Sequence, residues 1–373
     1  MRSRLTKLTL HGYKTIRDLE EFEPRSLMLM IGANGAGKSN LISFFRLLSY
    51  ALNGELQRYV AEFGPASAIL HDGPDRTRDI EAELTIETEA GENQYAFRLA
   101  FAAGDTLIFT EEKFRYSRSG SVTPAGWKPA GAGHREAKLP KIGLEGDKKE
   151  GDKKTARVIL ALMQKIIVHQ FHNTSLTARI RLKWDSDDGR WLKEDGANLA
   201  PFLYRLKQQE PKYYRRIVET TQILLPFFQD YELEPEYGRL LLSWREKGSD
   251  RVFTAPQAGD GMLRLMALVA MLQQPEADLP NVLILDEPEL GLHPYAINVI
   301  SGLIKSISEQ VQVIVATQSV SFIDRFEPED IVVVDRQKRE STFRRLDRKA
   351  LDDWLEDYSM SELWEKNVVG GRP

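Results

Sequence analysis

Apolar and polar residues alternate along much of the first third of the chain, with the two-residue period of a half-buried β-strand. Residues 5–10 alternate in this way, and residues 27–31 form a continuous apolar run, LMLMI, typical of a buried strand. Between residues 80 and 116, short alternating runs are separated by Gly91, Gly104 and acidic turns; they cover residues 80–88, 95–101, 106–109 and 113–116. These runs predict an antiparallel meander.

The rest of the chain changes character twice. Residues 117–155 are rich in Gly, Pro and Ser and include a mixed-charge tract at 145–154, which predicts a flexible tip, with a specific binding element as the alternative. Residues 156–230 have mostly helical periodicity with breaks at Pro201, Pro211 and Pro226. The last third predicts helices at 262–273 and 295–309 and strands at 282–286, 312–317 and 331–335. This alternation predicts an α/β fold.

The composition excludes several kinds of chemistry. None of the 373 residues is a cysteine, so disulfides, thiolate metal sites and cysteine nucleophiles are ruled out. No segment approaches the roughly 20 apolar residues that a membrane span needs, and the first residues lack the apolar core of a signal peptide. We therefore expect a cytoplasmic protein without a membrane partner. The net charge of −4 leaves room only for a local basic patch.

A glycine-rich loop follows the apolar run 27–31 and precedes a segment with helical spacing. It reads GANGAGKS from Gly32 to Ser39 and fits the Walker A pattern. In such a loop the backbone N–H groups hold phosphates, Lys38 neutralises the β- and γ-phosphates during catalysis, and the Ser39 hydroxyl binds Mg²⁺. A purely structural glycine turn is the alternative. The candidate ATP-binding residues are Gly32, Ala33, Asn34, Gly35, Ala36, Gly37, Lys38, Ser39 and Asn40.

Two adjacent carboxylates end the apolar strand predicted at 282–286. Neighbouring residues of a strand point in opposite directions, so Asp286 and Glu287 are not expected to do the same job. We expect Asp286 to face the Mg²⁺ ion through water and Glu287 to act as the general base that polarises the attacking water. A solvated turn explains such a strand end when it stands alone. Paired with the loop at 32–39, it predicts ATP hydrolysis at a site whose halves are about 250 residues apart.

These motifs carry a resemblance to a known family. Together with the turn at 12–18, the loop at 32–39 and the stretch at 286–294 resemble the ABC-type ATPases of the RecF, SMC and overcoming-lysogenization-defect branch. The end of the chain, residues 364–373, resembles a bacterial subfamily of AAA-family ATPases. The resemblance implies an α/β fold: an ABC-ATPase head, made of a mixed central sheet with the P-loop and an antiparallel β meander, together with a mainly helical insert. The implied parts are residues 1–116 and 241–373 for the head and 117–240 for the insert.

The resemblance also implies that two heads sandwich two nucleotides, each head offering a signature loop to the γ-phosphate held by its partner. The matching loop is Gly259, Asp260 and Gly261, where glycine replaces the serine of the family. A turn before a core helix is the alternative. Gln318 stands at the switch position, where the family has histidine. Its amide can hydrogen-bond the γ-phosphate but cannot act as an acid or base at neutral pH, so we expect it to sense the phosphate. His293 lies in the D-loop, with communication across the dimer or a structural role as its two interpretations.

Three functions are compatible with these features. The first is an ATP-driven switch: a homodimer of heads that works in DNA transactions or antiphage defence with a separately encoded effector, as the resemblance implies. The second is a nucleotide-stabilised scaffold with little turnover, which Gly259 and Gln318 favour and Glu287 opposes. The third, the ATPase subunit of a membrane transporter, is disfavoured by the long insertion.

The insert contains a candidate nucleic-acid surface. Basic residues at 179, 181 and 183 flank Trp184, and residues 212–216 read KYYRR. Basic side chains interleaved with aromatic ones suit phosphate contact and base stacking. A solvated helix face with its tyrosines packed inward explains the same letters. Residues 170–175, QFHNTS, resemble a recurrent element of the subfamily whose role the sequence does not reveal.

Overall fold

A central six-stranded sheet organises the molecule. The computed structural model describes residues 3–121, 123–144 and 149–372. The strand order is β17-β16-β3-β15-β14-β8, and all strands are parallel except the edge strand β17, which is antiparallel to β16. The bounds are β3 Leu27–Ile31, β8 Ile166–His169, β14 Val282–Asp286, β15 Gln312–Ala316, β16 Ile331–Gln337 and β17 Glu340–Arg345. Every residue of β3, β14 and β15 is buried, because layers cover both faces of the sheet.

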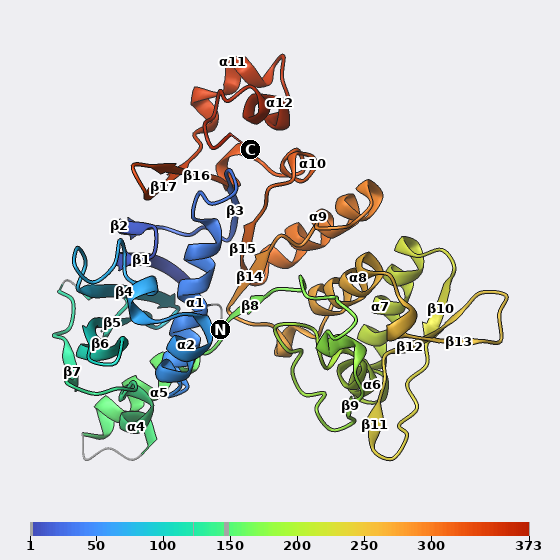
Figure 1. Ribbon diagram of the computed structural model, residues 1–373, viewed down its shortest axis with the longest axis horizontal. Coiled ribbons are helices and arrows are strands. Elements are labelled where there is room, and N and C mark those ends of the chain that lie inside the picture. Colours follow the sequence, from blue (N-terminus) through green and yellow to red (C-terminus); the bar gives the residue numbers. More distant parts are fainter. Residues whose placement is uncertain (1–2, 122, 145–148, 373) are drawn as a thin grey trace.

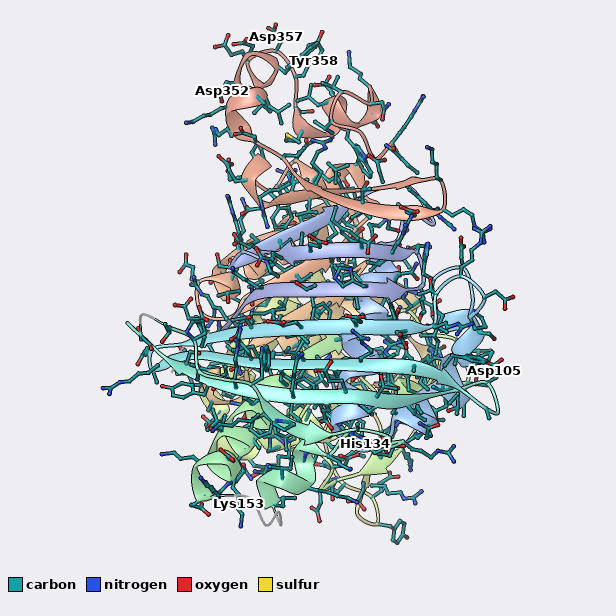
Figure 2. The ribbon with its side chains drawn as sticks, turned by 90° about the vertical axis from the view of Figure 1, so that its left-hand side faces the viewer. Asp105, His134, Lys153, Asp352, Asp357 and Tyr358 are labelled. Atoms are coloured by element: carbon teal, nitrogen blue, oxygen red, sulfur yellow. The ribbon has the colours of Figure 1, made fainter. Side chains whose placement is uncertain are left out.

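A second six-stranded sheet is wholly antiparallel, in the order β2-β1-β4-β5-β6-β7, and its strands lie side by side in Figure 2. The bounds are β1 Arg4–Tyr13, β2 Ile16–Phe22, β4 Asp79–Thr88, β5 Gly91–Ala102, β6 Thr106–Arg118 and β7 Lys128–Gly131. The predicted meander is therefore confirmed. The runs 106–109 and 113–116, predicted as separate strands, form one strand, β6, because a register shift between Arg98 and Leu99 of β5 accommodates the interruption.

One hydrophobic core lies between the two sheets. Helix α1, Lys38–Leu52, buries apolar residues there, including Phe44 and Leu48, against Met28 and Met30 of the central sheet. The remaining helices on this side are α2 Leu56–Phe63, α3 Ala66–Ile69, α4 Leu139–Leu144 and α5 Glu150–Met163. Because α1 follows directly from the loop after β3, its start is fixed at the carboxyl edge of the central sheet.

A second core covers the other face of the central sheet. It includes α8 Asp260–Leu272, α9 Pro294–Ser308, α10 Val320–Ile323 and α12 Met360–Glu365. Residues 174–273, which we call the second lobe, lie on the opposite side of the molecule from the antiparallel sheet in Figure 1. The other elements of this lobe are α6 Leu199–Gln209, α7 Pro211–Leu224, β9 Trp184–Asp185, β10 Phe228–Tyr231, β11 Arg239–Leu240, β12 Ser243–Glu246 and β13 Val252–Thr254; α11, Asp352–Leu355, precedes α12.

The structure corrects three predictions about the middle of the chain. The flexible tip predicted for 117–155 contains β7, α4 and the start of α5, while residues 145–148 of its charged tract lie outside the described residues. The mostly helical range 156–230 includes β8, which pairs with β14 in the central sheet although it lies within the predicted insert. Pro201 is no break, since it sits in the first turn of α6, where proline is tolerated. The boundaries at 116 and 240 stay predictions.

Pro211 and Pro226 lie where the prediction placed breaks: Pro211 is the first residue of α7 and Pro226 follows its end. The predicted helices 262–273 and 295–309 and the strands 312–317 and 331–335 match α8, α9, β15 and β16 to within two residues at each end. Across the described ranges, no helix combines the length and apolar character needed to cross a membrane.

Candidate nucleotide site

The loop between β3 and α1 is shaped by close backbone contacts. A side chain at Gly32 would place its Cβ 2.2 Å from the carbonyl oxygen of Val334. A side chain at Gly37, where φ is +120°, would place its Cβ 2.1 Å from the Ser341 hydroxyl. Both approaches require glycine, and both come from β16 and β17 on one flank of the loop. The neighbouring sheet edge thus holds the loop in its wrapped conformation.

The start of α1 is open to an anion. Its N-cap residue, Gly37, provides no side-chain cap, and no acidic residue lies in the first turn. Lys38 is 4% exposed, and its ammonium donates to the carbonyl oxygens of Gly32 at 2.5 Å and Ala33 at 3.1 Å. Burial lowers the pKa of Lys38, and the carboxylates of Glu287, Asp286 and Glu289 oppose that shift. Uncapped N–H groups next to an enclosed ammonium fit a phosphate group.

The outer residues of the loop differ from the inner ones. Ser39, Asn34 and Gly35 are exposed, whereas Ala36 is buried, and the Ala36 carbonyl oxygen accepts from the Ser341 hydroxyl at 2.6 Å. The side-chain amide of Asn40 donates to the Thr15 hydroxyl at 2.6 Å, in the turn between β1 and β2. The side chain of Asn40 therefore braces the loop from behind.

Asp286 is the last residue of β14 and is 6% exposed. Its Oδ2 accepts from the amide of Gln170 at 3.0 Å, and its carbonyl oxygen lies 3.0 Å from Nε2 of His172. Burial is the main influence on the pKa of the Asp286 carboxyl and raises it. Arg46 of α1 donates to Oε1 of Gln170 at 3.0 Å, so this glutamine links α1 to the acidic strand end.

Glu287 adopts a left-handed backbone conformation, with φ of +43°, that is uncommon for a residue with a long side chain. Its N–H donates to the Ala316 carbonyl oxygen at 2.8 Å. Its carboxylate accepts from the amide of Gln318, two residues after β15, while Asp286 contacts the segment after β8. The two adjacent acids therefore have different partners. Their roles as metal ligand and general base stay predictions.

The donor set fits Mg²⁺ that arrives with a nucleotide. Across the residues that the structure describes, no group of three or more His, Cys, Asp or Glu side chains is arranged to hold a metal ion. Mg²⁺ commonly uses one or two protein oxygens and completes its shell with phosphate oxygens and water. The exposed Ser39 hydroxyl and the Asp286 carboxylate would hold it here, and the ion would neutralise charge on the β- and γ-phosphates.

The sequence assigned no role to three residues at this edge. Gln170 and His172 contact Asp286, and Glu289 accepts from the Thr317 hydroxyl. Glu289 is 7% exposed, burial raises its pKa to about 7, and its Oε2 has no hydrogen-bond partner. The signal for Gln170 was present, because it follows the apolar run IIVH, and carboxyl ends of parallel strands share one edge. That run had been assigned to a helical range.

The predicted signature and D-loop residues form a second group, away from the P-loop. Gly259 is the exposed N-cap of α8, and Asp260 pairs with Arg181 at 2.9 Å. A Cβ on Gly261 would lie 2.6 Å from the Gly291 carbonyl oxygen, so the signature loop packs against the D-loop of the same chain. In Figure 1, α8 lies on the side of the second lobe and α1 on the side of the antiparallel sheet. Helices α8 and α1 thus pack on opposite faces of the central sheet.

Arg264 connects α8 to both neighbouring loops. Its guanidinium donates to the carbonyl oxygens of Phe171 at 3.0 Å, His172 at 2.9 Å and Leu290 at 3.0 Å. His293, in contrast, acts locally: its Nδ1 accepts from the N–H of Tyr295 at 3.3 Å and caps α9. The contact supports the structural interpretation of His293, while its ring remains exposed.

The segment that resembles the subfamily tail returns to the P-loop. Gly371 donates to Oδ1 of Asp335 at 3.0 Å, and its carbonyl oxygen accepts from the Trp364 indole at 2.5 Å. A Cβ on Gly371 would lie 3.5 Å from the Cα of Gly32, the first glycine of the loop. Helix α12 also reaches α10, through Ser361 and Asp324. The segment backs the P-loop on the face of the sheet opposite α1.

The candidate nucleic-acid surface is smaller than predicted. Arg181 is 4% exposed and bonds to main-chain oxygens, so it is a structural residue and not part of a basic surface. Tyr214 is buried, with its hydroxyl on Asp230. Arg179 lies over the Trp184 ring at 4.9 Å and pairs with Asp195. The sequence letters alone did not separate the buried arginine from its exposed neighbours.

This fold and this edge define a class: a P-loop nucleotide-binding ATPase head with the fold of SMC head domains. The chain belongs to the family described as "AAA domain, putative AbiEii toxin, Type IV TA system", which covers residues 27–324. No curated protein matches the chain. The expected α/β fold is confirmed, while the finer assignment to a subfamily by its tail stays a prediction.

Two solved structures illustrate the likeness. An SMC head bound to the C-terminal winged-helix domain of ScpA has a TM-score of 0.59 and 16% identity, covering 93% of this chain and 99% of that one. An SMC head with an extended coiled coil, bound to the C-terminal domain of ScpA derived from Pyrococcus furiosus, has a TM-score of 0.55 and 18% identity, covering 95% and 99%. At these identities the likeness shows the fold alone.

Proposed function

We propose that this protein binds and hydrolyses ATP as a nucleotide-dependent dimeric switch. The observation that carries the proposal is the convergence of Lys38, Asp286 and Glu287, from segments about 250 residues apart, at one sheet edge. Lys38 would neutralise the phosphates together with the uncapped start of α1. Glu287 would accept a proton from the attacking water, and Gln318, which donates to it, would hold the carboxylate in place.

The second group of residues supports a dimer of heads. Gly259 and His293 are exposed, and Leu290 and Tyr295 of the same D-loop region are 43% and 53% exposed. A second copy would bring its own signature loop to the P-loop of the first, and the symmetric contact would complete both sites. The exposed apolar side chains of the D-loop would then be covered by the partner head.

The setting of the switch is also proposed. The family description, with its Type IV TA system, and the resemblance to the RecF and SMC branch support a role in antiphage defence or DNA transactions in the cytoplasm. Two similar SMC heads are bound to domains of ScpA, which supports a separately encoded protein partner here. The exposed basic residues around Trp184 support DNA as a further partner.

Phosphate release tests the enzyme reading. Wild type and Glu287→Gln are compared at saturating MgATP, each with sizing by light scattering with and without nucleotide. We expect the substitution to lower the rate by about 10²- to 10⁴-fold, the usual contribution of a general base, and to trap an ATP-bound dimer. Equal, near-zero rates in both proteins would favour the alternative, a nucleotide-stabilised scaffold. The observation that favours the scaffold is Gly259, which lacks the hydroxyl of the family's serine.

A further inference from the structure

A buried arginine of the second lobe holds the signature loop from behind. Arg181 ends the 3₁₀ turn η1, Arg179–Arg181, and its side chain is 4% exposed. Its guanidinium donates to the carbonyl oxygens of Thr174 at 2.9 Å, Ala255 at 2.6 Å and Ala258 at 3.0 Å, and to Oδ1 of Asp260 at 2.9 Å. Three of these four acceptors belong to the signature loop or to the turn directly before it. The contacts therefore fix that loop.

The contact with Ala258 decides which way the next amide points. In a trans peptide unit the C=O and the N–H point in opposite directions, and the described residues contain no cis peptide bond. Because the Ala258 oxygen faces the buried guanidinium, the N–H of Gly259 faces away from it, on the exposed side of the loop. There it joins the first turn of α8, which starts at Asp260 without a side-chain cap. Such a cluster of N–H groups suits a phosphate oxygen.

The contact with Asp260 balances a charge. The Asp260 side chain is 59% exposed and stands in the first turn of α8, where a carboxylate repels an incoming phosphate. Arg181 lies 2.9 Å from this carboxylate and supplies the opposite charge. In the described structure the first turn of α8 contains no basic residue, since Gly261 and Met262 follow Asp260. The neutralisation depends on Arg181.

We infer that Arg181 is a positioning residue for the signature loop. It turns the Gly259 amide outward and offsets the charge of Asp260. The loop, although it lacks the serine of the family, can then receive the γ-phosphate that a second copy holds. The inference rests on the proposed ATP-dependent dimer. Arg181 acts through the loop and touches no nucleotide. Through Thr174 it also joins the segment whose Gln170 and His172 contact Asp286.

The test separates nucleotide binding from dimerisation. In a Glu287→Gln background, Arg181→Met removes every donor while keeping an unbranched side chain. We measure the affinity for MgATP by calorimetry at low protein concentration, and the dimer dissociation constant by sedimentation at saturating MgATP. We expect the dimer to weaken about tenfold or more, since buried acceptors lose their donor, and the affinity for MgATP to change less than about threefold. An unchanged dimer overturns the inference.

Arg205→Met is the matched control. Arg205 lies in α6 of the same lobe, is largely buried, and donates to the Gly189 carbonyl oxygen at 2.8 Å and to Asp278 at 2.5 Å, with no contact to the signature loop. Thermal melting is expected to show a comparable loss of stability for both variants, with the dimer weakened only by Arg181→Met. Equal weakening by Arg205→Met means general destabilisation and contradicts the inference. A parent Glu287→Gln protein that stays monomeric with MgATP refutes the proposed switch itself, and with it this inference, before Arg181 is changed.

A second variant covers the case in which Arg181→Met does not fold. The side chain of Asp260 is exposed. The substitution Asp260→Asn keeps an oxygen as acceptor for Arg181 but removes the negative charge from the loop. We expect it to tighten the dimer about threefold to tenfold at low salt, and to recover part of the loss when combined with Arg181→Met. A dimer that is unchanged or weakened by Asp260→Asn contradicts the assigned charge balance.

Discussion

Two helices of this protein begin in a similar way and yet suit different tasks. Helices α1 and α8 both have a glycine as N-cap, Gly37 and Gly259, and neither has a side-chain cap. The first residue of α1 is Lys38, with no acid in the turn, whereas the first residue of α8 is Asp260, an acid. The start of α1 therefore fits an anion without the help of a distant residue. The start of α8 depends on Arg181 and suits a phosphate whose charge Lys38 of another copy already neutralises.

Removing the charge at the start of α1 is the strongest way to break this contrast. Lys38→Ala is expected to abolish detectable MgATP binding, because the enclosed ammonium is the main local counter-charge to the β- and γ-phosphates. Calorimetry with MgATP measures the effect. Lys349→Ala, at an exposed lysine in the 3₁₀ turn η5, Arg348–Ala350, serves as the control. Retained micromolar affinity in Lys38→Ala would refute the role of this lysine.

Glu289, one of the carboxylates that act on the charge of Lys38, makes the stability of this edge depend on pH. Burial raises the pKa of Glu289 to about 7, from 4.5 for the exposed group. As the pH rises from 4.5 to 7, Glu289 loses its proton in the unfolded chain before it does so in the folded protein, so rising pH favours unfolding. The resulting loss of folding stability is absent well below pH 4.5 and complete above pH 7. The difference of 2.5 units corresponds to about 2 to 3 kcal/mol between pH 5 and pH 8.

Denaturant unfolding of wild type and Glu289→Gln at both pH values measures this penalty. Glutamine keeps an oxygen for the Thr317 hydroxyl and has no titratable proton, so the substitution is expected to remove most of the loss of stability. Wild type and variant that lose stability in parallel as the pH rises would show that Glu289 is not the titrating group.

Packing behind the P-loop gives a smaller effect, again on the side of α1. A Cβ on Gly371 would lie 2.6 Å from a methyl group of Val333, and φ is +64° there. Gly371→Val is expected to displace this segment and to weaken MgATP binding severalfold, since overpacking of this kind costs about 1 to 3 kcal/mol. Gly302→Val, on α9 with open space around its Cβ, is the control in the same calorimetric measurement. Unchanged affinity in Gly371→Val would show that the segment does not support the loop.

The two helix starts also differ in how far the sequence predicted them. The strands 27–31 and 282–286 match β3 and β14, because a fully buried strand must be apolar throughout, and a glycine loop and an acidic turn mark their ends. The P-loop and the paired acids followed from those strands. For the α1 side of the site, local pattern and the rule that parallel strands end at one edge were sufficient.

In the second lobe and in the segments that the sequence did not assign correctly, distant contacts decide the structure. Arg181 has the same letter as exposed Arg179, and only its fit beneath residues 255–260 makes it a buried residue. The four residues of β8 are too few to show a period, and their place is set by pairing with β14. The segment expected to be flexible is ordered by Glu112 of β6, whose carboxylate accepts from the N–H groups of Lys138 and Leu139 at the start of α4. Local sequence patterns do not predict any of these long-range contacts.

Restoring the serine makes the two helix starts more alike. A Cβ on Gly259 meets no atom within 4 Å, and its φ of −69° suits any residue, so Gly259→Ser is expected to fold. Its hydroxyl adds one donor toward a charged phosphate at each of the two symmetric sites, worth about 1.5 kcal/mol per site, and the ATP-dependent dimer in the Glu287→Gln background is expected to tighten about a hundredfold by sedimentation. Gly259→Ala adds the same Cβ without the hydroxyl and should leave the dimer unchanged. If serine and alanine act alike, the loop does not meet a phosphate at this position.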